Sequence, residues 1–251
     1  MTELVKVVIL SHKRWNKVDT LKTVSNASLC VAESQAELYR QNYPDVEIIV
    51  HPDSVKGLSA KIRWTYQKFK NVVMLDDDLS GMVRNYVDSS FGIPFKVEPD
   101  TVYDILQHNA AMAKELGVKF YGFGSCPRPL DYNSMAPFKL TGFVMGGSFG
   151  FLDGFNMVLP DECVAACDSF LSAVSLFYHR YHLIDTRYSF KSKEATFKSV
   201  GGMSDFRTLE TEKEDFILLR KYFGDAIELR KKPVSRKSLQ HPYERKLIPP
   251  W

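Results

Sequence analysis

The sequence predicts an α/β domain built on a mostly parallel sheet with helices packed on its faces. Over residues 1–80, short β-branched or apolar segments alternate with amphipathic ones in the order β-α-β-α-β-α-β, an alternation typical of parallel α/β sheets. The fourth apolar segment begins at Asn71 and passes directly into three carboxylates, Asp76, Asp77 and Asp78. Ligands of open α/β sheets bind at the carboxyl ends of the strands. We therefore expect this edge to carry the function.

The first half of the chain supplies the strands and helices of this unit. The expected strands are 5–10, 28–33, 46–50 and 71–76, and the expected helices are 18–24, 35–42 and 60–69. The strand segments are rich in Val and Ile, as strands require. The third helix places Ile62, Tyr66 and Phe69 on one face, with Ser59 as its expected N-cap. No GxGxxG follows any of these strands, so the dinucleotide-binding fingerprint is absent.

The second half is less regular. Residues 81–99 read as a loop or small hairpin, 101–116 as a helix ended by Gly117, and 119–124 as a strand. Asp153-Gly154 predicts a hairpin within the glycine-rich segment 138–158. A helix over 161–181 is expected to be capped by Asp161, and one over 211–223 by a capping box of Thr211 and Glu214. A short strand over 226–229 follows. We expect one domain, 1–251, with halves 1–80 and 81–227 and a basic segment 228–251.

Composition restricts the class of protein. With 45% apolar and 25% charged residues, the chain is an ordinary globular protein. No apolar run approaches the ~20 residues of a membrane span, no signal-peptide core opens the sequence, and four cysteines do not make a disulfide framework. We therefore expect a cytoplasmic protein without membrane contact, in the host cytoplasm if it is viral.

Charge is concentrated at the carboxyl end. Residues 228–251 contain seven Lys or Arg and two Glu, a net charge of +5, whereas the whole chain carries +3. A basic segment beside a near-neutral body favours a polyanionic partner or a diphosphate. The alternative is a solvated tail that aids solubility.

The three consecutive acids favour a cation site. Neighbouring carboxylates repel and raise one another's pKa. A hard divalent cation, Mg²⁺ or Mn²⁺, removes that cost and keeps coordination positions for phosphate oxygens. The alternative is a solvated acidic turn.

This strand-to-acid stretch resembles the DXD motif of GT-A glycosyltransferases. The resemblance implies a GT-A-like (Rossmann-like) fold with a mixed, mostly parallel central sheet. It also implies Mn²⁺ or Mg²⁺ as cofactor and a nucleoside-diphosphate sugar, most simply a UDP-sugar, as donor. By this resemblance Asp78 is the principal metal ligand, Asp76 faces the ribose or a metal-bound water, and Asp77 is a further donor-site residue.

The resemblance also assigns other donor contacts. In this family the loop after the first strand receives the nucleotide, which implicates Ser11 and Arg14. An acid after the second strand recognises base or ribose, which implicates Glu33. A basic residue of the glycine-started helix reaches the diphosphate, and Arg63 is the choice because guanidinium binds phosphate in bidentate fashion. Asp153 is a candidate sugar contact, with a turn-forming Asp as the rival interpretation.

Catalysis is assigned in the same way. Glu214-Asp215 before an apolar helix resembles the xED motif of inverting GT-A enzymes, which makes Asp215 the candidate base and Glu214 the substitute. The rival interpretation is that helix-dipole preference alone explains these acids. His241 fits the carboxyl-terminal histidine that many GT-A enzymes add as a metal ligand, or it is a surface residue.

A zinc site can be excluded from the sequence. Cys163, Cys167, His179 and His182 have a suggestive order. On a continuous helix, however, Cys167 and His179 lie ~18 Å apart, too far for one tetrahedral site. Buried cysteines explain the pair better.

The acceptor is the last expectation. In size, charge and element order the chain resembles the compact glycosyltransferases of bacteriophages, which glycosylate hydroxymethylated pyrimidines such as hydroxymethylcytosine in DNA. The resemblance implies DNA as acceptor and partner, with Tyr243 and Trp251 available to stack on bases. The alternatives are a hexosyl- or pentosyltransferase acting on saccharide or protein, a nucleotidyltransferase, and a non-catalytic nucleic-acid-binding α/β protein.

Overall fold

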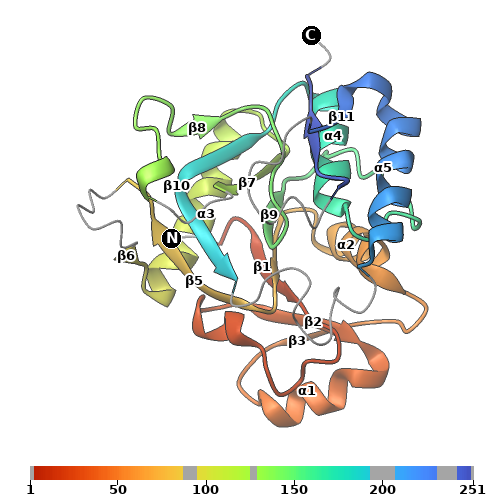
Figure 1. Cartoon of the computed structure of the whole chain (residues 1–251). Coiled ribbons are helices and arrows are strands. Elements are labelled where there is room, and N and C mark those ends of the chain that lie inside the picture. The colour runs from red at the N-terminus through yellow and green to blue at the C-terminus, as the bar shows by residue number, and fades with distance from the viewer. Residues whose placement is uncertain (1–2, 87–94, 125–128, 193–206, 231–241, 250–251) are drawn as a thin grey trace.

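A mixed ten-stranded sheet forms the centre of the molecule (Figure 1). The computed structural model describes residues 3–86, 95–124, 129–192, 207–230 and 242–249. The strands follow one another in space as β3-β2-β1-β4-β9-β7-β10-β5-β6, and β8 pairs with β10. Their bounds are β1 Lys6–Leu10, β2 Ser28–Ala32, β3 Ile48–His51, β4 Val72–Asp76, β5 Leu79–Arg84, β6 Phe95–Lys96, β7 Phe120–Gly124, β8 Phe138–Lys139, β9 Ser148–Phe151 and β10 Leu183–Ser192.

The predicted fold class is confirmed. Strands β1, β2, β3 and β4 are mutually parallel, and β7, β10 and β6 run in the same direction. Strands β9, β5 and β8 run the opposite way. The parallel strands of the first half are buried on both faces, which explains their continuous apolar runs.

Helices cover both faces of the sheet. They are α1 Ala36–Asn42, α2 Gly57–Phe69, α3 Pro99–Glu115, α4 Cys167–His179 and α5 Leu209–Phe223. One apolar core joins β1, β4 and β9 to α2, α4 and α5, and the other joins the opposite sheet face to α1 and α3. Short 3₁₀ turns, Asp19–Lys22, Glu33–Gln35, Pro129–Asp131 and Gly224–Ala226, connect some of these elements. A separate pair, β11 Ile227–Leu229 and β12 Arg245–Leu247, lies beside α5.

Several local expectations are confirmed. The four strands of the first half lie where predicted, residues 81–99 contain the antiparallel pair β5 and β6, and Gly117 follows α3 with φ +71°. The segment 18–24 forms only a 3₁₀ turn instead of a helix. Residues 183–192 form one long strand, β10.

Three capping expectations are wrong. Helix α2 begins at Gly57, and the Ser59 hydroxyl inside it donates to the Cys163 carbonyl. Helix α4 begins at Cys167, far beyond Asp161. The capping box of α5 is formed by Thr208 and Thr211, with Glu214 outside it.

The hairpin expected at Asp153-Gly154 is also absent. Both residues form a turn after β9, but the following segment forms no strand before α4. Strand β9 instead lies between β4 and β7, antiparallel to each. This insertion of a glycine-containing strand is the feature that most shapes the site.

Gly150 allows β9 to take that place. A Cβ built on it would lie 2.2 Å from Tyr121 Cζ and 2.5 Å from the Tyr121 hydroxyl oxygen. Tyr121 is fully buried on the neighbouring strand β7, so its ring has no space into which to move.

We predict that Gly150→Ala lowers the free energy of unfolding by about 3 kcal/mol, since a methyl group would overlap a fixed ring in a packed core. Urea denaturation followed by circular dichroism measures the change. Adding Tyr121→Leu to Gly150→Ala should recover part of the loss. Wild-type stability in the single variant would show that the sheet yields where we expect it to be rigid.

Candidate active site

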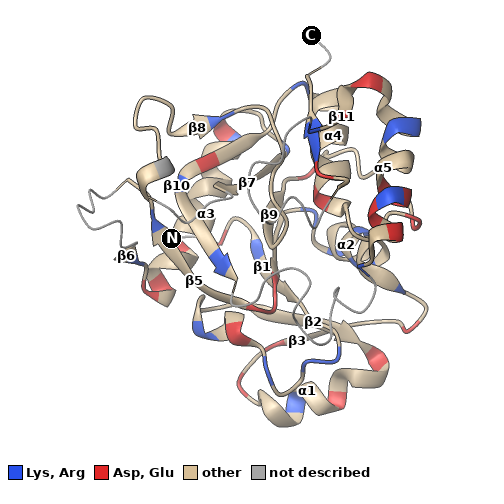
Figure 2. Cartoon of the chain, viewed as in Figure 1, with Lys and Arg blue, Asp and Glu red and all other residues tan. Residues whose placement is uncertain are grey.

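The three acids lie at the carboxyl edge of the sheet, beside the loop that follows β1. Leu10 of β1 is in register with Asp76, the last residue of β4. Asp77 and Asp78 form the turn between β4 and β5. Figure 2 shows this acidic turn as a red segment where β4 passes into β5.

Asp77 points into the protein. Its carboxylate accepts hydrogen bonds from the Ser11 hydroxyl (2.6 Å) and from the Arg14 guanidinium (2.6 Å). The Tyr39 hydroxyl lies 2.7 Å from that of Ser11. Burial raises the pKa of Asp77, while Ser11 and Arg14 oppose the shift. The predicted group of Ser11, Arg14 and Asp77 is thus brought together, with Asp77 joining the two edge loops.

Asp76 and Asp78 are the outward members of the turn. Asp76 is open to solvent, and Asp78 is half-buried with Arg14 at 3.5 Å. Although Asp76 as a residue is exposed, its carboxyl group lies among many protein atoms. The resulting desolvation raises the pKa of Asp76 to about 7. The nearby charges of Asp78, Asp77 and Asp168 raise it further in that order, against the influence of Arg14.

Asp168 is the functional candidate that the sequence interpretation missed. It lies in the first turn of α4, and its carboxylate accepts hydrogen bonds from the N–H groups of Gly146 (2.9 Å) and Ser169 (2.6 Å). A Cβ on Gly146 would lie 3.2 Å from Asp168 Oδ2, and one on Gly147 would lie 3.4 Å from Asp76 Oδ2. Two successive glycines therefore separate two carboxylates. A predicted helix that began at Cys167 instead of Asp161 would have placed Asp168 in the first turn and identified it as a candidate.

A buried lysine amine lies at the same edge. Lys61 Nζ donates to the Ser11 carbonyl (2.8 Å) from the second turn of α2. Burial lowers the pKa of Lys61, while Cys30 and Asp77 raise it. Arg63 lies on another face of α2, where it binds the Leu159 carbonyl and Asp161. The expectation that Arg63 serves this edge is therefore corrected, because residues two apart on a helix point in different directions.

Asp153 is corrected for a similar geometric reason. Strand β9 runs antiparallel to β4, and Phe151 pairs with Val72 at the amino end of β4. The Asp153 N–H accordingly binds the Asn71 side chain (2.9 Å) at the edge opposite to Asp76. Glu33, in contrast, follows β2 at the carboxyl edge and is exposed there, so its donor role stays a prediction.

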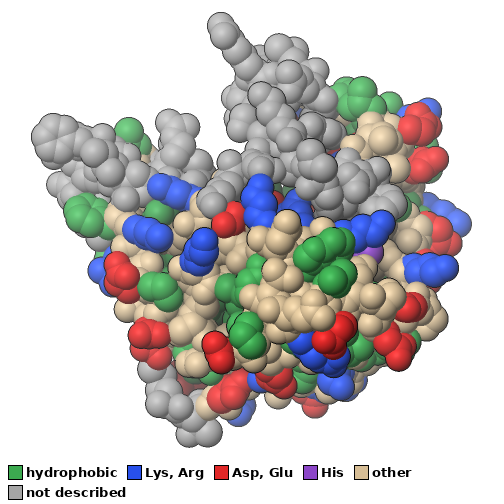
Figure 3. Space-filling view, turned by 90° about the horizontal axis from the view of Figure 1, so that it is seen from below, with side chains coloured by type: hydrophobic (Ala, Val, Ile, Leu, Met, Phe, Trp, Pro, Cys, Tyr) green, Lys and Arg blue, Asp and Glu red, His purple; other side chains and the backbone are tan. Residues whose placement is uncertain are grey.

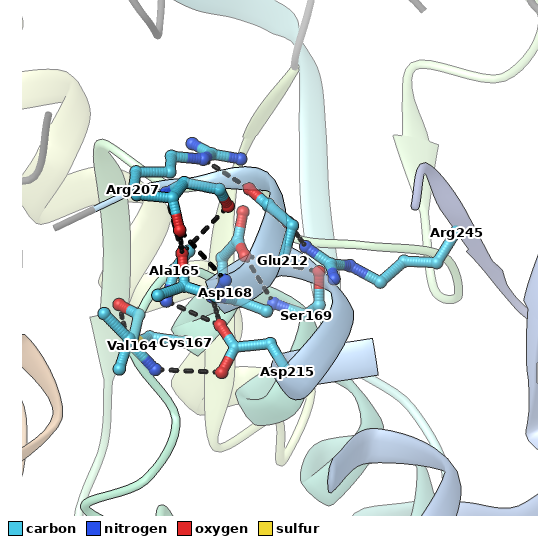
Figure 4. A network of polar contacts seen from close by, with 12 residues as sticks. Val164, Ala165, Cys167, Asp168, Ser169, Arg207, Glu212, Asp215 and Arg245 are labelled. Atoms are coloured by element: carbon cyan, nitrogen blue, oxygen red, sulfur yellow. Dashed lines mark hydrogen bonds and ion pairs between the residues drawn. The ribbon is translucent and has the colours of Figure 1, made fainter. Parts of the chain in front are cut away.

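Asp215 caps a helix in this structure. It is buried, and its two oxygens accept the N–H groups of Val164 (3.0 Å), Ala165 (2.6 Å) and Ala166 (2.7 Å), as Figure 4 shows. This burial does not favour the predicted role of Asp215 as catalytic base, because a base must reach the substrate hydroxyl. Glu214 is exposed on another face of α5. His241 lies outside the described residues.

A comparison with known families now decides what this edge belongs to. Residues 5–157 match the profile of a family described as TET-Associated Glycosyltransferase, and the match spans the chain from β1 past β9. The chain belongs to the TET-associated glycosyltransferase family. It contains the acids 76–78 and the glycines 146–147 within the matched part. No curated protein sequence matches the chain.

The remaining features agree with a transferase of this family. In the part of the chain that the structure describes, no helix is long and apolar enough to cross a membrane. Cys163 and Cys167 are buried free thiols, and the described residues hold no group of three or more His, Cys, Asp or Glu arranged around a metal.

The donor set of the TET-associated glycosyltransferase suits magnesium or manganese chemically. Mg²⁺ commonly takes one or two carboxylates from a protein and fills its other positions with water and substrate phosphates. Asp76 and Asp78 supply two such carboxylates, and the raised pKa of Asp76 reports negative charge without a compensating cation. These residues fit the ion that the family resemblance implies.

We predict that Asp76→Asn stabilises the unliganded glycosyltransferase at pH 8. The pKa of Asp76 is about 7 when folded and near 3.8 when unfolded, so ionisation opposes folding above pH 7. The effect should be about 1 kcal/mol after solvent screening, or about 2 °C in Tm. It should shrink as the pH falls from 7 and vanish below 4.

Thermal melts from pH 4 to pH 8 measure this difference. Asp45→Asn, at an exposed residue in the turn before β3, is the matched control. A stabilisation that does not change with pH would refute the electrostatic explanation.

Proposed function

We propose that this glycosyltransferase transfers a sugar from a nucleoside-diphosphate sugar to the hydroxyl of a 5-hydroxymethylated pyrimidine in DNA. The observation that carries the proposal is the pair of carboxylates, Asp76 and Asp168, on either side of Gly146-Gly147 at the carboxyl edge. One acid lies on the strand side, where a donor diphosphate would be bound. The other lies on the helix side, where an acceptor would approach.

The donor half of the site is built from loops after β1 and β2. Ser11 and Arg14 line the turn that carries the acids, and Glu33 is available for ribose or base. Lys61 donates to the Ser11 carbonyl and so holds the loop after β1 from behind. A UDP-sugar is the simplest donor.

Asp76 and Asp78 would hold Mg²⁺ or Mn²⁺, which when bound stabilises the charge of the departing diphosphate. Asp77 does not take part directly, since its oxygens bind Ser11 and Arg14. His241 is an additional proposed ligand from outside the described residues.

Asp168 would act as the general base. Its carboxylate takes the proton of the acceptor hydroxyl as that oxygen attacks the anomeric carbon of the sugar. The bond between the anomeric carbon and the diphosphate oxygen breaks in the same step, and nucleoside diphosphate leaves. Attack from the face opposite to the leaving group inverts the anomeric configuration. The hydrogen bonds from Gly146 and Ser169 orient the carboxylate for this role.

DNA contact is proposed from charge. In the basic segment, Arg230, Arg245 and Lys246 are ion-paired with Glu244, Glu212 and Glu228, so they supply little free charge. Lys231, Lys232, Arg236 and Lys237 lie outside the described residues. Figure 3 shows Lys and Arg side chains in a row across the face seen from below. Tyr243 lies against Phe216, which leaves base stacking to other side chains.

The acceptor experiment tests the function. The protein is incubated with UDP-glucose or other nucleotide sugars, Mn²⁺, and a duplex carrying one 5-hydroxymethylpyrimidine or the matched unmodified base. We expect sugar on the modified nucleoside alone by mass spectrometry, with release of nucleoside diphosphate. Asp168→Asn should transfer at least ~10²-fold more slowly, as for a lost general base. DNA binding should weaken steeply with salt because phosphate contacts release counterions.

Two results would overturn the acceptor assignment or the reaction class. Absence of transfer from every donor, together with salt-independent or absent DNA binding, would point to a saccharide or protein acceptor. Release of pyrophosphate in place of nucleoside diphosphate would indicate a nucleotidyltransferase.

Metal dependence gives a separate prediction. UDP should raise the Tm of the wild-type protein only when Mn²⁺ or Mg²⁺ is present. Asp78→Asn should lose at least ~10-fold in UDP affinity, because removing one carboxylate weakens the binding of the ion and with it the binding of UDP. Asp45→Asn should behave as wild type. Full UDP affinity in the presence of EDTA would refute the prediction.

A further inference from the structure

Helix α5 supplies the cap of helix α4. Asp215 is only 1% exposed, and its carboxylate accepts the three N–H groups of residues 164–166 directly before Cys167. The residue at the N-cap of α4 is Ala166, which has no side-chain acceptor. Helix amino ends need acceptors for their free N–H groups, and a negative charge there also satisfies the helix dipole. Asp215 accepts the N–H of the N-cap residue Ala166 and of the two residues before it, so it holds the segment that leads into α4 and places a negative charge beside the helix amino end.

The helix capped in this way carries Asp168 in its first turn. Asp168 lies two residues beyond Ala166, the last residue whose N–H binds Asp215. The Ser172 hydroxyl donates to the Asp168 carbonyl and accepts the Val144 N–H, which ties this turn to the glycine segment. A shift of residues 164–166 would therefore move Asp168 relative to Gly146 and Asp76.

A second buried acid fixes α5 itself. Glu212 lies one turn before Asp215 on the same face of α5 and is fully buried. It accepts hydrogen bonds from Arg207 and from Arg245 (2.9 Å), as Figure 4 shows. Arg245 belongs to β12, which pairs with β11. The carboxyl-terminal strand thus holds the start of α5, and a buried Glu without these arginines would be an uncompensated charge.

We propose that Asp215 is a positioning residue for Asp168, held in turn by the Glu212–Arg245 ion pair. The inference rests on the proposed role of Asp168 as the base. Asp215 touches neither the proposed donor residues nor Asp76, so it acts only through the first turn of α4. Its loss should slow the chemical step and leave donor binding intact, because the hydrogen bonds that tie Asp77 to Ser11 and Arg14, and Ser11 to Lys61, do not include Asp215.

The test is a double-mutant cycle of Asp215→Asn and Asp168→Asn. Asparagine cannot accept at both positions, because its NH₂ group would face an amide donor. We expect kcat of Asp215→Asn to fall about 30-fold with donor KM within 2-fold, the size of effect expected from a small misplacement of a reacting group. The double variant should stay within about 3-fold of Asp168→Asn alone, since a base that is absent cannot be misplaced.

Hydrogen exchange gives a readout that does not need activity. Amides of residues 164–170 should exchange faster in Asp215→Asn than in wild type. Glu210→Gln is the matched control, since Glu210 is an exposed acid in the first turn of α5. It removes the same charge and should change neither exchange nor turnover. If Asp215→Asn does not fold, Asp215→Glu replaces it in the cycle, because Glu keeps both acceptors but pushes residues 164–166 outward.

The outcomes separate this inference from the proposed function. The positioning role would be overturned if the two losses in kcat multiplied in the double variant. It would also be overturned if Asp215→Asn changed neither amide exchange nor kcat. The base assignment would stand in both cases. Normal turnover of Asp168→Asn would overturn the base assignment, and the positioning role with it.

Discussion

Asp76 donates its backbone N–H to the Gly147 carbonyl (2.9 Å), and the neighbouring Gly146 N–H is donated to the Asp168 carboxylate (2.9 Å). These two hydrogen bonds connect the end of β4 with the start of α4 through one short backbone segment. They set the separation of two acids that come from elements far apart in sequence. The antiparallel insertion of β9 makes this possible, because β9 begins at the carboxyl edge, with Ser148 opposite Leu75.

The three acids of the turn face different ways, one into the protein and two outward. Asp77 faces inward, where Ser11 and Arg14 compensate it. This contact joins the β1 loop to the β4 turn and so holds the edge together. Asp76 and Asp78 remain outward, and the charge of Asp78 adds to the desolvation that raises the pKa of Asp76. A protein gains nothing from such repulsion when unliganded, so the arrangement makes physical sense as a site prepared for a cation.

The sequence was sufficient where local rules decide the structure. Apolar runs identified β1 to β4, and the strand-to-acid junction pointed to the carboxyl edge of the sheet, where the three acids lie. It failed where a tertiary contact overrides a local signal. Arg63 and Lys61 are equally basic, but only the direction of the α2 face shows which one reaches Ser11. Asp153 depends on the direction of β9, which turn chemistry does not reveal.

The acids of α4 and α5 show why motif spacing misassigns function. Glu214-Asp215 has the look of a catalytic pair, yet Asp215 is buried against three amide donors. Asp168 stands in an ordinary apolar helix and looks like a first-turn acid of the kind that dipole preference explains. Only the turn of backbone around Gly146 brings it to Asp76. Both acids accept amide hydrogen bonds on both oxygens, but Asp215 is buried and Asp168 is half-buried. A buried acid can position a reacting group, whereas an acid at an open edge can exchange a proton. The distinction between positioning and reacting acids therefore depends on which carboxylate a substrate can reach, and that is a property of the fold rather than of the motif.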